Sequence, residues 1–196
     1  MLNKKIKATG SGVIAGFGMV AKSTIQSGEV IWAPEKKYPL VSSSELTQMY
    51  QQGGAIGYSQ VGVDLFAKNE LREWFVNHSC EPNCVSKHQS LVAVRVIMAG
   101  EEITYDYGLT ETLFEWLFWC KCGSPDCRVF VSNRDYLGCR LRQKMKGQVP
   151  EHALIAASRA SKVEVIRYHL RLVRYRLRYW VFADRPLLKW LRWVRW

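Results

Sequence analysis

The chain has 196 residues, 48% of them hydrophobic, which excludes disorder throughout and leaves room for one core with an appendage. Its formal charge of +11 is unevenly placed, because residues 1–139 carry 13 basic and 14 acidic side chains whereas residues 140–196 carry 15 and 3. The body is therefore nearly neutral, and a uniformly basic nucleic-acid-binding protein is excluded.

Six cysteines could form disulfides in a secreted domain or remain thiols in a reducing compartment. Lys4, Lys5 and Lys7 precede the apolar run VIAGFGMVA, as in a signal peptide, but this run is short, holds two glycines and lacks a clear cleavage site. No charge-free apolar run reaches membrane-spanning length. We therefore expect an intracellular protein that is not secreted and whose cysteines are available to a metal.

Short elements alternate with glycine-rich turns over the first two thirds of the chain. Residues 10–32 predict short extended segments, and the polar stretch 41–62 contains SSSEL, a helix start. Residues 91–97 and 103–107 predict two strands separated by the turn MAGEE. The run ETLFEWLFW, 111–119, predicts a short helix. The fold class is therefore mainly β, without regular alternation of strand and helix.

The pattern changes near Arg140. Residues 151–182 favour a helix, although the strict alternation of RYRLRY, 174–179, leaves a strand as an alternative there. Four arginines of this segment follow spacings of four, three and four residues, and so share one helical face: Arg167, Arg171, Arg174 and Arg178.

A second basic helix is expected after ADRP, where Asp184 could cap a helix entered through Pro186. It holds three tryptophans: Trp190, Trp193 and Trp196. The basic segment 140–196 has three interpretations. It packs its apolar face on the core, it lies on an anionic membrane surface, or it contacts nucleic acid without sequence specificity.

The cysteines suggest a metal site. Three of them form a C-x-C-x4-C array: Cys120, Cys122 and Cys127. Such closely spaced thiolates cannot all pair as disulfides, but they can occupy three corners of a tetrahedral zinc site. Cys80 is the natural fourth ligand, and free thiols are the alternative. For Cys84 and Cys139, an ordinary small apolar role is favoured over metal binding.

The stretch VNHSCEPNC, 76–84, could be a metal knuckle, a nucleophile beside its base, or a cofactor clamp. Together with three other motifs it resembles the SET-domain protein-lysine methyltransferases. The four motifs follow the order of that family: GFGMVA (16–21), FVNHSCEPN (75–83), GEEITYDYG (100–108) and CKCGSPDC (120–127). The resemblance covers about residues 10–130.

The resemblance implies a SET (β-clip-like) fold of several small sheets with a pseudoknot. It also implies a catalytic core at 10–118 and a post-SET zinc segment at 119–135. The resemblance does not cover the basic helical extension expected at 140–196, which rests on its charge and periodicity. One position departs from the family pattern, because Trp74 stands where an arginine is usual and Arg72 lies two residues earlier.

The resemblance further implies S-adenosyl-methionine and zinc as cofactors. Cofactor-binding residues would be Gly16, Phe17, Gly18, Asn77, His78 and Tyr107. Zinc ligands would be Cys80, Cys120, Cys122 and Cys127. His78 would hold the cofactor through backbone groups, with a buried core histidine as the alternative. A zinc-bound Cys80 would not be a nucleophile.

Tyr107 would be the catalytic tyrosine, and Tyr105 would limit the number of methyl groups added, whereas Asp106 would be a structural hydrogen-bonding residue. We expect methylation of lysine in a protein substrate, a histone among the candidates, favouring mono- or dimethylation. The alternatives are a catalytically silent SET-like binding module and an adaptor that contacts a membrane or nucleic acid through its basic tail.

Overall fold

The computed structural model describes residues 2–12, 14, 16–33, 39–53, 57–68, 75–87 and 90–183. The chain forms two compact units, Met1–Arg159 and Ala160–Trp196. Among the described residues, no helix is both long enough and apolar enough to cross a membrane.

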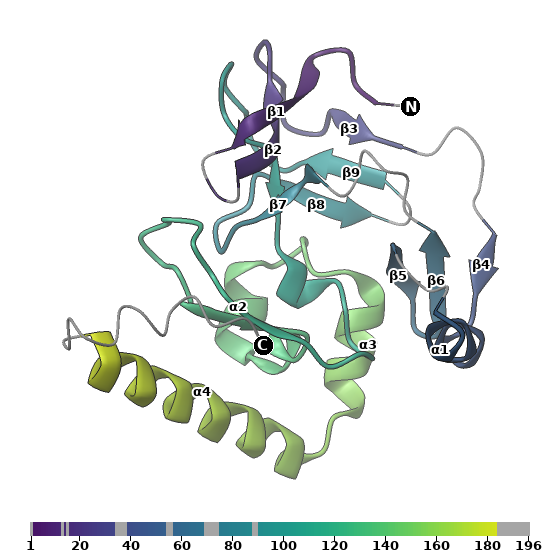
Figure 1. The fold of residues 1–196 in the computed structure, drawn as a ribbon, viewed down its shortest axis with the longest axis vertical. Coiled ribbons are helices and arrows are strands. Elements are labelled where there is room, and N and C mark those ends of the chain that lie inside the picture. Colours follow the sequence, from purple (N-terminus) through teal and green to yellow (C-terminus); the bar gives the residue numbers. More distant parts are fainter. Residues whose placement is uncertain are drawn as a thin grey trace. The chain divides into compact units, whose positions relative to one another are not determined.

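The N-terminal part of the first unit is built from short strands, as expected for residues 10–32. Strand β1 (Ile6–Gly12) pairs antiparallel with β2 (Gly16–Ala21). Strand β3 (Val30–Trp32) belongs to a three-stranded antiparallel sheet of order β3-β9-β8, completed by β9 (Ser90–Ala93) and β8 (Cys84–Lys87) (Figure 1). The predicted strand at 91–97 is thus regular only in its first half.

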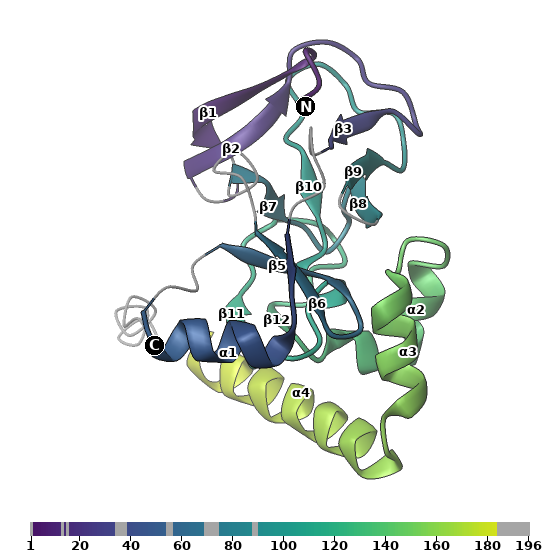
Figure 2. The same ribbon diagram turned by 90° about the vertical axis from the view of Figure 1, so that its right-hand side faces the viewer.

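A second three-stranded antiparallel sheet has the order β4-β6-β5. Its strands are β4 (Leu40–Val41), β6 (Leu65–Lys68) and β5 (Tyr58–Gly62). Helix α1 (Ser43–Gln51) connects β4 to β5 along the chain and lies beside this sheet (Figure 2).

Helix α1 begins where the sequence predicts a helix start. The Glu45 backbone N–H donates to the Ser42 hydroxyl (3.3 Å), and the Ser42 N–H donates to the Glu45 carboxylate (2.7 Å). This reciprocal pair is a capping box, which satisfies two backbone donors at the helix start.

Two motif segments meet in a parallel pair of very short strands. Strand β7 (Asn77–His78) pairs with β10 (Thr104–Tyr105), so that Asn77 is opposite Thr104 and His78 is opposite Tyr105. The segment leading into β10 also bonds to β2, because the Ile103 N–H donates to the Met19 carbonyl (2.7 Å). Three of the four motifs therefore share one region of the first unit, whereas the pseudoknot stays a prediction.

The predicted helix at 111–119 is wrong. Residues 117–119 form strand β11 (Leu117–Trp119), which pairs antiparallel with β12 (Phe130–Ser132). The pairing places Phe118 opposite Val131, which is fully buried. Aromatic and β-branched side chains suit this packing, and tertiary contacts here override the helical reading.

One short helical element lies between β10 and β11, and three more follow β12. They are η2 (Tyr107–Leu109), η3 (Asp135–Leu137), α2 (Cys139–Lys144) and α3 (Glu151–Arg159). Helix α3 is anchored in the first unit, because Nε2 of the buried His152 lies 2.7 Å from the Thr110 carbonyl oxygen. The predicted extension 140–196 is therefore divided between the two units.

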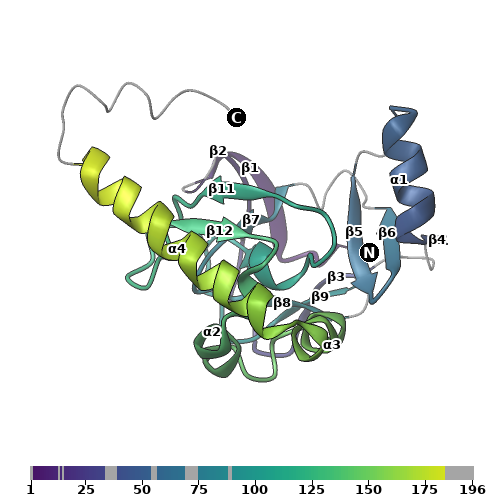
Figure 3. The same cartoon turned by 90° about the horizontal axis from the view of Figure 1, so that it is seen from below.

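The second unit contains α4 (Lys162–Ala183), a single uninterrupted helix (Figure 3). The expected helix over 151–182 is broken at Ala160 and Ser161, where Ser161 and Glu164 form a second capping box. The strand alternative for 174–179 is wrong, because these residues continue α4. The predicted cap at Asp184 and the tryptophans after it lie outside the described residues.

The main core of the first unit lies between β2, β3, β9 and the segment before β10. Its fully buried side chains are aliphatic residues separated along the chain: Met19, Ile25, Ile31, Ile97 and Ile103. Packing of this core fixes the strands that carry the motif residues.

Candidate active site and metal centre

Asn77 lies on β7 and bonds to two segments distant in sequence. Its side-chain amide donates to the Phe17 carbonyl (Nδ2–O 2.6 Å) and to the Glu102 carboxylate (Nδ2–Oε1 2.6 Å). One amide therefore ties the glycine-rich strand β2 to the GEEITYDYG segment. Phe17 and Asn77, both predicted to bind the cofactor, are brought together, and the Phe17 side chain itself is 64% exposed.

Gly18 faces the Glu102 carboxylate so closely that a side chain does not fit. A Cβ atom at Gly18 would lie 2.5 Å from Oε1 of Glu102 and 3.4 Å from the amide nitrogen of Asn77. Gly16 has a φ of +80°, a left-handed conformation that favours glycine. Glu102 is absent from the predicted site residues, and its only signal is the glutamate pair of GEEITYDYG.

Tyr107 is oriented by a hydrogen bond to the backbone. Its hydroxyl donates to the Val76 carbonyl, with an oxygen–oxygen distance of 2.6 Å. Burial, and then the negative charge of Glu102, raises the pKa of Tyr107 to about 12. The phenol therefore stays protonated at neutral pH and acts as a hydrogen-bond donor, not as a base.

Aromatic rings surround the Tyr107 side chain. The Tyr105 ring lies 4.8 Å from it and the Phe118 ring 5.9 Å, measured between centroids. Trp116 stacks on Phe118 at 5.7 Å. We call Tyr105, Tyr107, Trp116 and Phe118 the aromatic cluster. The last two were not predicted as site residues, because they fall in the run interpreted as a helix.

His78 connects Tyr107 to the cysteines. Its Nδ1 accepts the Tyr107 backbone N–H (3.2 Å), and its Nε2 lies 3.4 Å from the Cys80 sulfur. Because Nδ1 is the acceptor, Nε2 is the ring atom that carries a proton toward that sulfur. The ring is 4% exposed and internally bonded, as the core-histidine alternative describes. A backbone contact of His78 with the cofactor stays a prediction.

The four cysteines predicted to bind zinc converge. Their sulfur atoms all lie within 4.8 Å of one another, and those of Cys80 and Cys120 are 3.8 Å apart. A tetrahedral site with Zn–S bonds of about 2.3 Å separates its sulfurs by about 3.8 Å, so the four residues fit a zinc ion. We call Cys80, Cys120, Cys122 and Cys127 the thiol cluster. All four are free of disulfides.

Hydrogen bonds favour the thiolate form of Cys80, whereas burial raises the pKa of the Cys127 thiol. The bond from the Cys120 thiol, together with those from His78 and the Arg128 backbone, lowers the pKa of Cys80 to about 2, whereas the pKa of Cys120 is raised by the same pairing. The sulfurs of the thiol cluster also accept hydrogen bonds of 3.3 to 3.4 Å from three backbone N–H groups, which belong to Cys122, Arg128 and Val129. Thiolates are the forms that bind zinc.

The two remaining cysteines lie outside the cluster, as predicted. Cys84 is buried, and desolvation raises the pKa of its thiol to about 12, which suits a small apolar core residue. Cys139 is exposed, so the expectation of a packed apolar role holds only for Cys84.

A buried ion-pair group joins the motif segment to the cysteine segment. Nη2 of Arg128 lies 2.5 Å from Asp106, and its Nε lies 3.4 Å from Asp135. Burial raises the pKa of Asp135 to about 6, whereas the two carboxylates hold the pKa of Arg128 above its usual range despite its burial. Asp106 also accepts the Gly108 N–H (3.0 Å), in agreement with its expected structural role.

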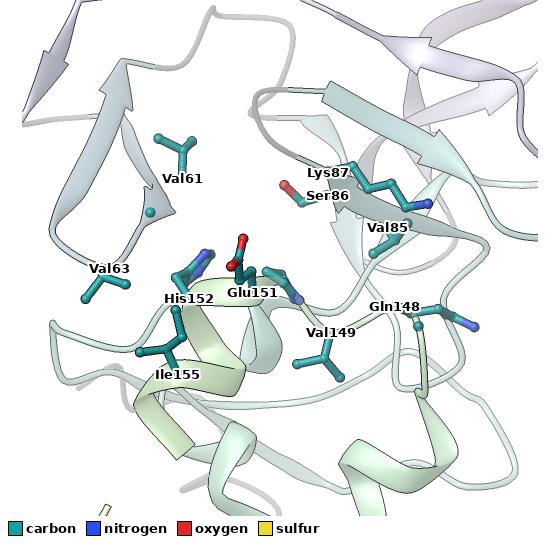
Figure 4. Close-up of a pocket in the computed structure, with 13 residues that line it drawn as sticks. Val61, Val63, Val85, Ser86, Lys87, Gln148, Val149, Glu151, His152 and Ile155 are labelled. Atoms are coloured by element: carbon teal, nitrogen blue, oxygen red, sulfur yellow. The ribbon is translucent and has the colours of Figure 1, made fainter. Parts of the chain in front are cut away.

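A hollow of about 400 Å³ lies elsewhere in the first unit (Figure 4). Its lining includes Val61 and Val63 of the β5–β6 hairpin, Val85 and Lys87 of β8, and His152 of α3. None of the predicted site residues lines it. Tyr105 instead borders a much smaller void of about 10 Å³, about the least space that holds one water molecule.

The matched family decides the identity of the fold. The SET domain family matches residues 16–108, which contain the glycine-rich strand, Asn77 and Tyr107. The chain carries a SET domain. Cys80 lies inside the matched range, whereas the other three cysteines of the thiol cluster and the aromatic residues Trp116 and Phe118 lie beyond it. Trp74, at the one departure from the family pattern, lies outside the described residues.

Curated relatives of this SET domain are large proteins. The human "Histone-lysine N-methyltransferase 2B" is 34% identical over 137 residues, covering 61% of this chain and 5% of the relative. The Drosophila melanogaster "Histone-lysine N-methyltransferase trithorax" is 30% identical over 132 residues, covering 61% and 4%.

A fission yeast relative, "Histone-lysine N-methyltransferase, H3 lysine-4 specific" of Schizosaccharomyces pombe, is 41% identical over 78 residues, covering 36% of this chain and 8% of the relative. The chain therefore spans less than a tenth of the length of these three relatives.

Proposed function

We propose that this protein transfers methyl groups from S-adenosyl-methionine to the side-chain amine of lysine in a protein substrate. The observation that carries the proposal is the convergence of Gly18, Asn77 and Tyr107 from three separate segments of the SET domain. Hydrogen bonds of 2.6 Å fix Asn77 to β2 and Tyr107 to Val76.

The reaction is an in-line displacement that needs no covalent intermediate on the protein. S-adenosyl-methionine supplies a methyl group on a positively charged sulfur. A nitrogen–carbon bond to the lysine forms while the carbon–sulfur bond breaks, and the new ammonium releases a proton to solvent. The protein contributes alignment, which accounts for much of the acceleration in such reactions.

The cofactor is expected beside the glycine-rich strand β2. The lack of a side chain at Gly18 lets the Glu102 carboxylate lie against this strand, because a Cβ atom there would be 2.5 Å from Oε1 of Glu102. The Glu102 carboxylate next to this glycine provides negative charge, which suits a cationic ligand. The assignments of Gly16, Phe17, Gly18 and Asn77 come from the family resemblance, and the contacts of Asn77 with Phe17 and Glu102 support them.

Tyr107 orients the reacting groups. Its protonated hydroxyl and the Val76 carbonyl place oxygen atoms side by side, and such oxygens can accept contacts from a polarised methyl group. The aromatic cluster contributes by desolvation, because an apolar environment lowers the pKa of lysine and favours the neutral amine that attacks.

The thiol cluster has a structural part in the proposal. Cys80, Cys120, Cys122 and Cys127 would hold one zinc ion and thereby join Cys80, next to the Asn77–His78 strand, to a segment forty residues away. His78 transmits this constraint to the Tyr107 backbone. Because the ligands must stay reduced, an intracellular location is part of the proposal.

Tyr105 is proposed to favour mono- or dimethylation. Its ring packs 4.8 Å from Tyr107, and a hydroxyl at this place reduces the room for a methylated amine. Tyr105→Phe should shift the product toward more methyl groups per lysine, as measured by mass spectrometry of the modified substrate. An unchanged product distribution would refute this role.

Histones are the proposed substrate class, because the three relatives described above carry histone-lysine methyltransferase in their names. Contact of residues 140–196 with an anionic membrane surface or with nucleic acid stays a prediction. It is supported by the exposed arginines Arg167, Arg171 and Arg174 of α4.

The test is transfer of labelled methyl groups to core histones and to a host lysate. We expect transfer by the wild-type protein and a loss of at least about 100-fold in Tyr107→Phe, with cofactor binding retained. Tyr50→Phe is the matched control, because Tyr50 is 53% exposed and belongs to α1.

Two outcomes would contradict the proposal. Normal turnover by Tyr107→Phe would remove the role given to its hydroxyl. Cofactor binding without transfer to any lysine in the lysate would support the silent binding module instead.

A further inference from the structure

Helix α4 carries an apolar surface that methyl transfer does not use. Five aliphatic side chains lie along it at alternating spacings of three and four residues, each between 53 and 63% exposed, and we call them the α4 stripe: Val163, Ile166, Leu170, Val173 and Leu177. These spacings are those of heptad positions a and d, which form the contact line between paired helices.

Basic side chains border the stripe on both sides. With Val163 at position a, Arg167 and Arg174 occupy e positions, whereas Lys162 and His169 occupy g positions; all four are exposed. The only acidic residue of α4 is Glu164, which bonds back to Ser161 at the helix start. The flanks of the stripe therefore carry positive charge without acidic compensation.

These flanks oppose pairing of α4 with a second copy of itself. In a parallel pair, e positions face g positions, which would set Arg167 against Lys162 of the other copy. In an antiparallel pair, arginine would face arginine. Like charges at these positions destabilise pairing in either orientation.

The stripe also disfavours nucleic acid and lipid as occupants. Phosphates would satisfy the arginines but leave five aliphatic side chains without apolar contact. A helix at a membrane surface presents a strongly polar face to water and often uses Trp or Phe on the other. The stripe, defined on the described side chains, contains neither residue. Elsewhere on α4 the buried Tyr168 and the half-buried Leu172 and Tyr175 leave no strongly polar face among these side chains.

We propose that the α4 stripe binds an amphipathic helix of another protein, with aliphatic residues at its a and d positions and Asp or Glu at its e and g positions. Such a helix would cover the stripe and place carboxylates opposite Arg167 and Arg174. This interaction is independent of the proposed methyl transfer, and its test needs neither cofactor nor substrate.

The test uses the full chain and two synthetic three-heptad peptides as probes. Both have Leu or Ile at a and d, one with Glu and the other with Lys at every e and g. We expect the full chain to bind the Glu peptide at least about tenfold more tightly than the Lys peptide by fluorescence anisotropy, with affinity falling as salt rises.

Variants separate the stripe from its flanks. Leu170→Gln should weaken binding of the Glu peptide at least about tenfold, because Leu170 is 63% exposed and central in the stripe. Arg171→Gln is the matched control at a b position and should change affinity less than about twofold. The double variant Arg167→Glu with Arg174→Glu should reverse the preference toward the Lys peptide.

Four outcomes would overturn the proposal. The first is equal binding of both peptides, and the second is self-association of the chain that Leu170→Gln abolishes. The third is binding to phosphatidylserine vesicles, lost in Leu170→Gln, without binding of the Glu peptide. The fourth is that an isolated α4 peptide binds the Glu peptide but the full chain does not, which would mean that another part of the same chain covers the stripe. Helical circular dichroism of each variant checks that α4 still folds.

Discussion

The region around Tyr107 and helix α4 are held together in opposite ways. Around Tyr107, each decisive contact joins residues far apart in sequence, such as Asn77 with Phe17, 60 positions away, and Tyr107 with Val76, 31 positions away. Helix α4 begins with a bond between Ser161 and Glu164, only three positions apart. The first region therefore depends on the folding of the whole unit, whereas the second is specified locally.

The largest effect is expected where one change breaks the most distant contacts. Cys120→Ser should lower the zinc content from about one ion per chain to a small fraction and destabilise the first unit by several kcal/mol, because zinc binding contributes directly to folding. Metal analysis and denaturant unfolding measure these effects. Cys139→Ser, at an exposed cysteine outside the thiol cluster, is the control and should change neither.

Retention of zinc by Cys120→Ser, or an equal effect of Cys139→Ser, would contradict the four-cysteine site. If α4 unfolded at the same denaturant concentration as the first unit, the expected difference between a locally specified helix and a unit held by distant contacts would be contradicted. Circular dichroism of the helix and intrinsic fluorescence, followed in one titration, can separate them.

A smaller effect is expected at Glu111, which connects to β5. Its carboxylate accepts the Gln60 backbone N–H at 3.0 Å, across 51 positions, and burial raises its pKa to about 7 from an ordinary value of 4.5. The folded state therefore holds a proton more tightly than the unfolded state. The contribution of this group to stability falls as the pH rises from about 4.5 to about 7 and is lowest above that window.

Glu111→Gln keeps an acceptor for Gln60 and removes the buried charge. We expect it to raise the free energy of unfolding by up to about 3 kcal/mol at pH 8, and by less than about 1 kcal/mol at pH 5. Denaturant titrations at the two pH values measure this, with Glu115→Gln, at a more exposed carboxylate, as control. If Glu111→Gln instead lowered the free energy of unfolding at pH 8, the surroundings would stabilise the charged Glu111 carboxylate, and the prediction would be contradicted.

The smallest effect is expected from the local contact. Ser161→Ala removes the hydroxyl that accepts the Glu164 N–H and should reduce the stability of α4 by about 1 kcal/mol. Amide hydrogen exchange in the first turn of α4 should rise about fivefold, with the first unit unchanged. Ser158→Ala, in the last turn of α3, is the control. If it raised amide exchange in the first turn of α4 as much as Ser161→Ala does, the Ser161 cap would have no specific role.

The local features were predictable because their signals are contiguous. The helix start in SSSEL and the four motifs could be located from the sequence, and the motifs identified the SET domain; the capping box of Ser42 and Glu45 is what the structure adds at that helix start. The same signal at Ser161 and Glu164 was overlooked, so α3 and α4 were expected as one helix.

The misses in the site are non-local. Glu102 and Phe118 acquire their places only when β2, β7 and β11 come together, and no spacing rule indicates this. The run 111–119 was predicted as a short helix, whereas the pairing of residues 117–119 with β12 depends on residues beyond the cysteines. Arg128 gave no signal other than its position after Cys127.

His78 stands between a sulfur of the thiol cluster and the backbone of Tyr107. If the thiol cluster holds zinc as proposed, oxidation or loss of that zinc would therefore affect the proposed reaction centre through a single imidazole ring. Specific activity should then differ between preparations in proportion to their bound zinc, and turnover numbers would be comparable only when expressed per metal-loaded molecule.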